Sequence, residues 1–427
     1  MGPVHCGLDF GTSNSTVAVA SSESAARLLP LEDGRVTIPS ALFFSFEDDR
    51  TWFGRRAVEE YVTGADGRLM RSLKSVLGTS LFTETTRIKR RALPLAEILG
   101  TFVGELKRRS EASLGRQIAD VVVGRPVHFV DDDAAADLEA QRQLEGAVRT
   151  QGFRHVEFQF EPIAAALDYE QQVRREELAL VIDIGGGTSD FSVVRVSPER
   201  AGSPDRQRDI LATAGVHIGG TDFDRLLSML KAMPQLGRGT ATRDGKRQLP
   251  TAPYYDLATW HRINRLYSQQ TLLELRSTRL EATQPERVEQ MIALVEQRLG
   301  HRLAAHVEAA KIALTDAPSA TLAFEARGVS LRAEVSLADL FLALSDAIER
   351  IAGTIGRTIE AAGVGPADIQ TLILTGGSTQ IPAIMARLRQ LFPEAAFVST
   401  DAFGSVGLGL ALDARRKFGA SLELARA

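Results

Sequence analysis

The sequence predicts an α/β fold built from two similar lobes, and three observations support this prediction. The segment LDFGTS at residues 8–13 returns as IDIGGGTS at residues 182–189, which sets Asp9 and Asp183 174 positions apart. Each copy is followed by an apolar run typical of a strand. A further glycine turn, at residues 376–379, separates a strand pattern from a helix pattern. The 427 residues leave room for such a duplication, because domains average roughly 150 residues.

Composition excludes several classes of protein. Hydrophobic residues make up 44% and charged residues 24%, as in ordinary globular proteins. Fifty basic residues against 54 acidic ones leave a net charge of −4, which disfavours nucleic-acid binding. Cys6 is the only cysteine, so no intrachain disulfide can form. Neither a signal peptide nor an apolar run of about eighteen residues is visible. We therefore expect a cytoplasmic protein that binds neither nucleic acid nor membrane.

The repeated order of strand, acid, glycine turn and strand predicts a phosphate-binding hairpin. A Rossmann motif needs its glycines to open a helix, and a Walker A loop needs a Gly-Lys-Ser/Thr ending; the chain shows neither. Glycine allows backbone N–H groups to approach an anion, and the hydroxyls of Thr12, Ser13 and Thr188 add donors. Two such hairpins facing each other would clamp a polyphosphate.

Asp9 and Asp183 each lie at the end of an apolar strand, where burying a carboxylate is costly without a cation or several donors. We expect both to face a hydrated Mg²⁺ through its water molecules, since this ion keeps its waters and favours carboxylates. One hairpin alone would be weak evidence, because Asp-x-Gly-x-Thr also suits an ordinary turn. The second copy favours the phosphate interpretation.

Between the hairpins, residues 119–126 form a predicted strand, and Asp131, Asp132 and Asp133 precede a helical pattern. We interpret this acidic triplet as a helix cap rather than a metal site. Residues 156–160 are again strand-like, and a helix follows from Glu161.

Residues 231–253, rich in Gly, Arg, Thr and Pro, are expected to form an exposed loop or insertion. Apolar residues recur at helical spacing over 288–307 and predict buried helix faces. The small residues of 403–409 suit a close helix contact. His301 and His306 are five positions apart and predict no shared metal site.

Several of these segments together resemble the nucleotide-binding domain of the 70-kDa heat-shock chaperones (DnaK type), members of the actin-like ATPase superfamily. Residues 7–15 and 182–190 are similar to the family's two phosphate motifs, and residues 161–166 to its first connecting motif. Residues 217–224 resemble the segment after the second phosphate motif, which separates this family from actins and sugar kinases. The resemblance runs from Gly7 to about Leu412.

The resemblance implies a two-lobed actin-like ATPase fold, an α/β fold of duplicated ribonuclease-H-like domains with inserted subdomains. We expect lobe I over residues 1–170 with an insert at about 39–95, and lobe II over residues 171–400 with a helical insert at about 229–317. Residues 401–427 would form a C-terminal helix returning to lobe I.

The same resemblance implies the catalytic residues, and ATP or ADP with Mg²⁺ as the bound species. Glu161 would orient the attacking water or accept its proton, unless it is only a solvated carboxylate at a helix start. Lys74, in a looser match, would reach the γ-phosphate and offset its charge, unless it is merely a solvated lysine. Asp183 and Thr188 complete the expected catalytic set. The expected phosphate-side contacts are Gly11, Thr12, Ser13, Asn14, Gly186, Gly187, Gly219, Gly220, Gly376, Gly377 and Ser378.

The adenosine side departs from the family's pattern. Glu308 and Lys311 match likely ribose contacts, and Thr315 stands for a serine. Ile312 and Gln380, however, occupy the two positions where arginines would cover the adenine. The loss of two guanidinium stacking contacts, worth about 1–2 kcal/mol each, predicts weaker nucleotide affinity or relaxed base preference.

The family's hydrophobic linker, peptide-clamp domain and helical lid have no counterpart in these residues, so we expect a stand-alone, chaperone-like member. The expected function is ATP binding with slow Mg²⁺-dependent hydrolysis in a monomer. Nucleotide would set the angle of the cleft between the lobes, and an unidentified partner or client protein would read that angle through residues 231–315. The alternatives are an actin-like filament protein, a kinase for a small metabolite, and a nucleotide sensor with negligible turnover. Nucleotide-dependent sedimentation would favour the filament, and ATP consumption accelerated by a sugar would favour the kinase.

Overall fold

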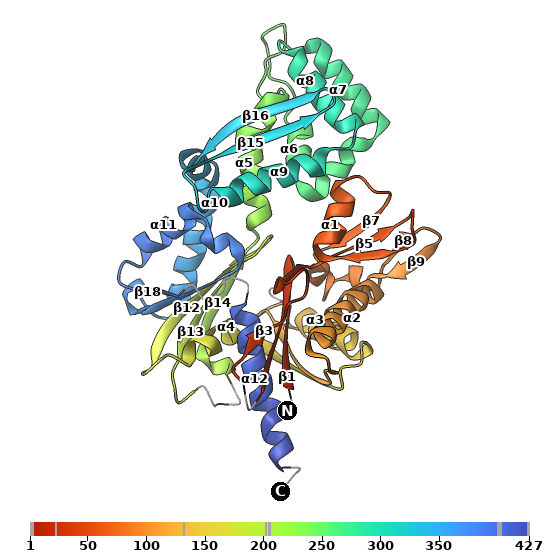
Figure 1. The fold of residues 1–427 in the computed structure, drawn as a ribbon. Helices are drawn as coiled ribbons and strands as arrows, with labels where there is room; N and C mark the ends of the chain where they lie inside the picture. Colours follow the sequence, from red (N-terminus) through yellow and green to blue (C-terminus); the bar gives the residue numbers. More distant parts are fainter. Residues whose placement is uncertain are drawn as a thin grey trace.

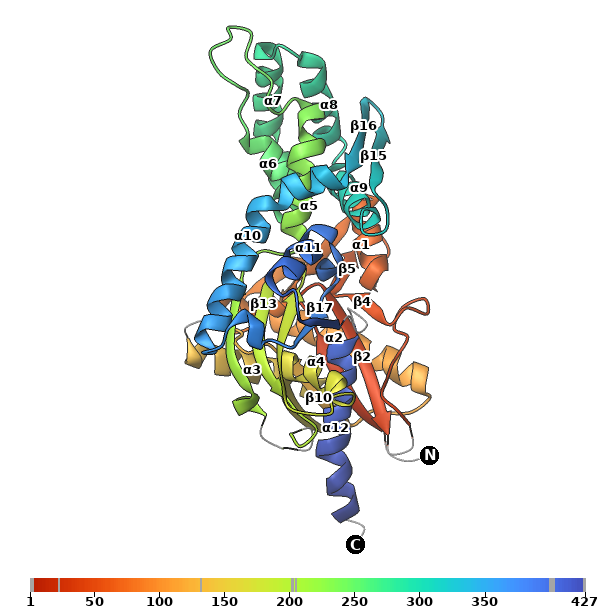
Figure 2. The same cartoon turned by 90° about the vertical axis from the view of Figure 1, so that its left-hand side faces the viewer.

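The structure is a computed structural model that describes residues 4–21, 24–130, 133–200, 203, 206–398 and 404–424. The chain forms two lobes side by side, each built on a mixed β-sheet with helices around it (Figure 1). The same arrangement viewed after a 90° turn shows the last helix running down along the junction of the lobes (Figure 2). The predicted α/β fold with two similar lobes is confirmed.

The first sheet has the strand order β11-β10-β1-β2-β3, with β4 also paired to β2. Strands β1, β2 and β3 are antiparallel neighbours, whereas β1, β10 and β11 run parallel. The three valines of β10 are fully buried, as expected for a parallel strand covered on both faces. The bounds are β1 Val4–Phe10, β2 Asn14–Ser21, β3 Arg27–Leu28, β4 Thr37–Pro39, β10 Asp120–Arg125 and β11 His155–Phe160.

The second sheet repeats this topology. Its order is β14-β13-β12-β17-β18, again three antiparallel neighbours followed by two parallel additions. The helices repeat as well. In the first repeat α2 precedes β10, α3 joins β10 to β11, and α4 follows β11. In the second repeat α10 precedes β17, α11 joins β17 to β18, and α12 follows β18. The strands are β12 Glu177–Ile184, β13 Ser189–Val196, β14 Ile210–Val216, β17 Thr371–Thr375 and β18 Ala396–Val398. The helices are α2 Leu95–Leu114, α3 Ala134–Thr150 and α4 Glu161–Glu170 in the first repeat, and α10 Leu337–Ala361, α11 Pro382–Leu391 and α12 Ser405–Leu424 in the second.

Both repeats carry extra structure at the same position, which is between β3 and α2 in the first repeat and between β14 and α10 in the second. We name residues 29–94 the first insert and residues 217–336 the second insert. The first contains β5 Ala41–Ser45, β6 Thr51–Phe53, α1 Gly54–Val62, β7 Gly67–Arg71, β8 Thr85–Ile88 and β9 Arg91–Pro94. The second contains α5 Gly220–Lys231, α6 Ala252–Ala258, α7 Gln269–Glu281, α8 Pro285–Glu296, α9 Gly300–Ala313, β15 Ser319–Ala326 and β16 Val329–Ser336. Short 3₁₀ turns connect these elements: η1 Leu73–Val76, η2 Ser80–Thr83, η3 Gln207–Asp209, η4 Met233–Leu236, η5 Trp260–Tyr267, η6 Pro366–Asp368 and η7 Gly377–Gln380.

The division into lobes and inserts proposed from the sequence stays a prediction, and the structure adds one detail to it. The hairpin β15–β16 packs against α8 and α9, although it lies beyond the expected end of the second insert near residue 317. Packing therefore groups this hairpin with the insert.

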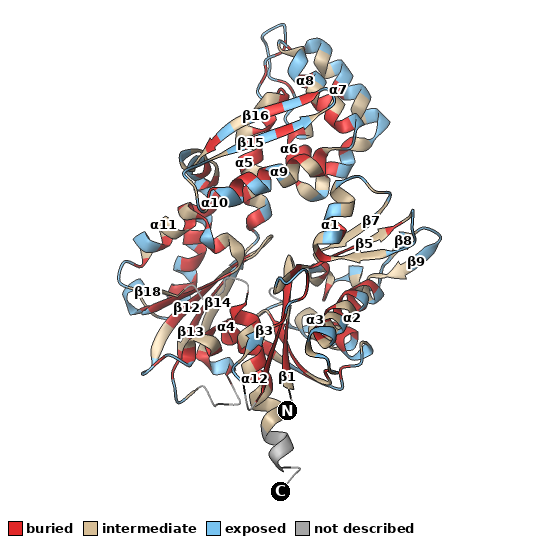
Figure 3. Ribbon diagram, in the orientation of Figure 1, coloured by how far each residue is buried: buried red, intermediate tan, exposed pale blue. Residues whose placement is uncertain are grey.

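The three largest apolar cores among the described residues hold the molecule together, and the buried residues fill both lobes (Figure 3). One core lies in each lobe, and the third joins them around α4 and α12. These two helices approach closely, because a Cβ at Gly409 would lie 1.7 Å from the carbonyl oxygen of Ala164. The close helix contact predicted from the small residues is present, although residue 403 lies outside the described part of the chain.

Several local predictions have clear outcomes. Asp133 caps α3, since its carboxylate accepts from the backbone N–H groups of Ala135 at 3.1 Å and Ala136 at 3.0 Å. Asp131 and Asp132 lie outside the described residues. The apolar stripe at 288–307 is buried across α8 and α9, as predicted. The expected loop at 231–253 is only partly exposed, because Met233, Leu236 and Leu249 enter the core of the second lobe.

Over the residues that the structure describes, no helix has the length and apolar character needed to cross a membrane.

Candidate functional site

The two glycine turns meet between the lobes. The turn at residues 11–13 joins β1 to β2, and the turn at residues 185–188 joins β12 to β13. A Cβ at Gly186 would lie 2.1 Å from the Ser13 hydroxyl oxygen, so only glycine allows the two turns to come this close. In the described chain, the N–H groups of Ser13, Gly186 and Gly187 have no hydrogen-bond acceptor. The turns therefore present free donors next to each other, as an anion site requires.

Two further glycine segments close around the second turn. Gly219 and Gly220 start α5, where the N–H of Gly220 donates to the Gly185 carbonyl at 2.9 Å. A Cβ at Gly219 would lie 2.6 Å from the backbone of Gly186 and Gly187. The predicted segments 185–188 and 219–220 are therefore packed backbone against backbone.

The turn after β17 lies against the end of β12, at Asp183 and Ile184. Gly376 has φ +80°, and a Cβ there would lie 2.7 Å from Asp183 Oδ1. Ser378 donates to the Gly185 carbonyl at 3.4 Å, and a Cβ at Gly220 would lie 2.8 Å from Ser378 Oγ. Gly377 opens the short η7 turn beside them.

Asp9 and Asp183 occupy matching places at the ends of β1 and β12, and both are partly buried. Burial raises the pKa of Asp9 to about 7, helped by Glu161 and opposed by Lys74. Burial raises the pKa of Asp183 to about 8, helped first by Asp190 and then by Glu161 and Asp9, again against Lys74. Because Glu161 and Lys74 act on both groups, the carboxyl groups of Asp9 and Asp183 share one electrostatic site between the lobes.

Lys74 and Glu161 form an ion pair of 2.5 Å with side chains only 10% and 15% exposed. Lys74 lies in η1 of the first insert, and Glu161 is the first residue of α4. Burial alone would lower the pKa of Lys74, but Glu161, and to a lesser extent Asp9 and Asp183, outweigh it and raise that pKa. Lys74 is therefore held as a cation among three carboxylates.

Thr12, Asn14 and Thr188 complete the phosphate side. Thr12 is partly exposed in the first turn, and Asn14 begins β2, where its carbonyl lies against Gly11. The hydroxyl of Thr188 donates to Asp190 Oδ2 at 3.2 Å. The structure thus brings the predicted phosphate-side residues of both lobes to one place.

A metal ion would fit this site through water rather than by direct coordination. Where the structure describes the chain, no three His, Cys, Asp or Glu side chains come together as ligands. Asp9 and Asp183 nevertheless lie in surroundings that penalise their charge, and a hydrated divalent cation would remove that penalty.

The predicted adenosine-side residues lie on and just after α9. Glu308 is exposed, whereas Lys311 is buried, pairing with Asp224 at 2.7 Å and donating to the Gly220 carbonyl at 3.2 Å. Thr315 follows the helix in a turn. Lys311 therefore ties α9 to α5 as well as bordering the predicted ribose position. Ile312 is 57% exposed and Gln380 is also exposed, so both departures from the family pattern lie on the surface.

Side chains that the sequence did not single out join the two inserts. Tyr61 of α1 donates to Asn264 at 3.2 Å, and its hydroxyl lies 3.4 Å from His301 Nε2. The ring of His301 packs between Tyr61 and Trp260, with centroid distances of 4.7 and 4.8 Å. We name Tyr61, Trp260, Asn264 and His301 the clasp. Burial lowers the pKa of His301 to about 4, so this ring is neutral near pH 7.

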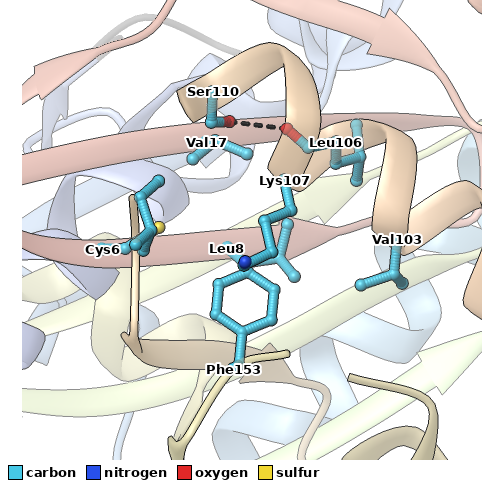
Figure 4. A pocket seen from close by; sticks show the side chains of 9 residues that line it. Cys6, Leu8, Val17, Val103, Leu106, Lys107, Ser110 and Phe153 are labelled. Carbon is cyan, nitrogen blue, oxygen red and sulfur yellow. Dashed lines mark hydrogen bonds between the residues drawn. The ribbon is translucent and has the colours of Figure 1, made fainter. Parts of the chain in front are cut away.

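One small hollow in the first lobe carries no site. Its lining is mostly apolar, including Cys6, Leu8 and Phe153, with Lys107 and Ser110 as the polar members, and it is too tight for a water molecule (Figure 4). Burial raises the pKa of Cys6 to about 12, which makes its thiol unreactive. This hollow is a packing defect of the core.

Two repeated lobes, paired glycine turns and paired aspartates define an actin-like ATPase fold. A family model described as "Hsp70 protein" matches residues 5–232 and 284–421, most of the chain. The chain therefore belongs to the Hsp70 family. The unmatched residues 233–283 lie within the second insert.

Curated relatives agree with this assignment. The chain is 27% identical to "Chaperone protein DnaK" of Thermotoga neapolitana over 412 residues, covering 96% of this chain and 58% of that protein. It is also 27% identical to "Chaperone protein HscA homolog" of Shewanella denitrificans over 429 residues, covering 96% of this chain and 57% of that protein. The chain thus spans less than three fifths of the length of these relatives.

Proposed function

We propose that the chain binds ATP together with Mg²⁺ and hydrolyses the γ-phosphate slowly. The observation that carries this proposal is the meeting of the two glycine turns, with free N–H donors on both sides and an aspartate behind each. A polyphosphate bound there would touch both lobes. The relatives' names support a chaperone role, and we propose the same role for this chain.

Each part of the site has a role in this proposal. The N–H groups of the turns and the hydroxyls of Ser13 and Thr188 would bind phosphate oxygens. Asp9 and Asp183 would hold the water shell of the metal ion. Bound Mg²⁺ would neutralise charge on the phosphate oxygens. The residues expected at the ribose are Glu308, Lys311 and Thr315.

The ion pair between Lys74 and Glu161 supports slow turnover. Glu161 would orient the attacking water, and Lys74 would offset the charge that develops on the transferred phosphoryl group. Lys74 Nζ donates to Glu161 Oε1 at 2.5 Å, so this carboxylate oxygen is already occupied by the lysine and is not free for the attacking water. The lysine must shift toward the phosphate before Glu161 can act, which supports a slow chemical step.

We further propose that the bound nucleotide sets the separation of the lobes and that a partner or client protein reads this separation. The lobes share the packed crossing of α4 and α12 at one end, and the clasp joins the inserts at the other. A nucleotide held between them would link movement at one end to contact at the other.

Mg²⁺-ATP binding and single-turnover hydrolysis test the proposal. We expect Glu161→Ala and Lys74→Ala to bind ATP but to hydrolyse it at least about 100-fold more slowly, the scale of a lost catalytic group. Asp183→Asn should lose most of its dependence on Mg²⁺. Glu157→Ala, an exposed glutamate in β11, is the matched control and should behave like wild type. If wild type binds no nucleotide at millimolar concentration, or if the three variants hydrolyse at the wild-type rate, the site assignment is wrong.

A further inference from the structure

Arg71 is a charged residue that the sequence pattern did not mark. It is the last residue of β7, three positions before Lys74, and it is partly buried. Its guanidinium carbon lies 4.7 Å from the ring centroid of Trp260 in η5. An arginine of the first insert therefore crosses to the second insert and stacks on an aromatic ring.

The surroundings of Arg71 leave its donors unused. Within the described residues, the guanidinium has neither a hydrogen-bond acceptor nor an ion-pair partner. Burial lowers the pKa of Arg71, while Glu308 and Asp224 raise it, so these are the carboxylates that face it. A guanidinium offers five N–H donors in one plane, and stacking on Trp260 leaves all of those edges available.

The ring contacts place Arg71 beside α9, because Trp260 also packs against His301, which lies seven residues before Glu308 on the same face of that helix. Glu308 is an expected ribose contact, and Asp224 holds Lys311, the other expected ribose contact. Ile312 lies four residues after Glu308 on the same face of α9 and supplies no guanidinium. An unpaired arginine thus lies next to the end of the site where two arginines are missing.

We propose that Arg71 binds the adenosine end of the nucleotide from the first lobe, stacked on Trp260. This inference rests on the proposed function. It gives the nucleotide a guanidinium contact from the lobe opposite to α9, so the adenosine end, like the phosphates, is held by both lobes.

The test compares two probes, ATP and inorganic tripolyphosphate, each bound by the full chain with Mg²⁺. Arg71→Leu should weaken ATP binding about tenfold, the scale of one lost guanidinium contact, and change the Kd of tripolyphosphate less than twofold. Arg71→Lys should fall between wild type and Arg71→Leu, because lysine keeps the charge without the planar group. Arg68→Leu removes an exposed arginine from the same strand and should change neither Kd.

The outcomes separate this inference from the proposed function. Equal weakening of both probes in Arg71→Leu would overturn the inference, because it would indicate a general effect on charge or folding. An unchanged Kd for ATP in Arg71→Leu would also overturn it and leave the proposed function intact. Wild-type protein that binds neither probe would overturn the proposed function itself. Should Arg71→Leu fail to fold, the same comparison is made with Arg71→Lys, for which unchanged ATP binding overturns the inference.

Discussion

Asp9 and Asp183 hold carboxyl groups in surroundings that oppose ionisation. Their pKa values of about 7 and 8 lie well above the usual value near 3.9 for an aspartate in an unfolded chain. In the folded protein without nucleotide, these groups keep protons that the unfolded chain would release. Burial therefore opposes ionisation at these two residues, and carboxyl groups with pKa values shifted in this way are concentrated at functional sites.

This conflict predicts how stability depends on pH. Between pH 4 and 8 the folded state binds more protons at Asp183 than the unfolded state does, so stability falls as pH rises through this range. We expect Asp183→Asn, which cannot ionise, to flatten this fall and to raise the melting temperature of the nucleotide-free protein by about 2–5 °C at pH 8.5. Thermal denaturation from pH 5 to 9 without Mg²⁺ measures the effect. The exposed Asp346→Asn serves as control, and a variant that melts below wild type at pH 8.5 would contradict the sign.

The clasp acts at the scale of whole elements, because it connects α1 to η5 and α9. Tyr61 lies 203 residues from Asn264 and 240 residues from His301 along the chain. Tyr61 crosses to the second insert through three polar contacts of its hydroxyl and one ring contact with His301, a small connection compared with the packed core around α4 and α12. Such a connection can open without unfolding either lobe.

Removing the clasp should accelerate nucleotide release. Tyr61→Phe loses the hydroxyl and its hydrogen bonds, and Tyr61→Ala also loses the ring against His301. One or two hydrogen bonds correspond to about a two- to tenfold faster dissociation, with the larger effect for Tyr61→Ala. Stopped-flow release of a fluorescent ADP analogue measures the rate. Thr63→Ala removes only the two hydrogen bonds from the Thr63 hydroxyl to the Glu59 and Glu60 carbonyls at the end of α1, and this variant should release at the wild-type rate. Equal rates in wild type and Tyr61→Ala would show that the clasp does not limit release.

The contrast between the glycine hairpins and the clasp explains which elements were predictable. The hairpins can be recognised from local sequence, because the aspartate, the glycines and the two strands follow one another within about fifteen residues. Their recurrence predicted the duplicated fold, which is confirmed, and it supplied most of the residues proposed to contact the phosphates. The roles expected for Lys74 and Glu161 came from the family resemblance, and their ion pair was not predicted, because nothing local to residue 74 indicates a partner 87 positions away.

His301, Arg71 and Trp260 belong to no motif that can be recognised in the sequence around them. His301 shows no metal spacing and was therefore set aside, yet its ring lies at the centre of the clasp. Arg71 ends an ordinary strand, and Trp260 opens a short 3₁₀ turn. Their contact depends on how the two inserts face each other, which no periodicity encodes. The buried Leu249 within a polar segment was missed for the same reason.

At the scale of the whole molecule, the lobes are joined by a crossing of two helices that tolerates only small residues. Gly409 of α12 faces Ala164 of α4, and a Cβ at Gly7 of β1 would lie 2.3 Å from the backbone of Ala411. The third core gathers around this crossing. The relative position of the two sheets therefore depends on the absence of side-chain atoms at a few positions.

A side chain at this crossing should disturb both lobes together. We expect Gly409→Val to lower the free energy of unfolding by about 2–3 kcal/mol, the usual cost of overpacking a tight core. Gly419→Ala on the same helix is the control, because its Cβ would meet only His5 Nε2 at 3.8 Å and alanine favours helix. Urea denaturation of both variants provides the comparison. Gly409→Val as stable as wild type would mean that the helices separate easily.

The matching positions of the two inserts have a consequence for how this architecture can grow. The first insert lies between β3 and α2, and the second lies between β14 and α10. The pseudo-symmetry of the repeats brings both inserts to the same side of the molecule (Figure 1). Residues added at these junctions extend both sides of the molecule around the site and also supply Lys74 and Gly220, whereas the first two strands of each repeat carry the glycine turns and the two aspartates. A change within either insert can therefore alter both the access to the site and the residues proposed to contact the nucleotide, whereas the aspartates and the glycine turns belong to the two repeated sheets.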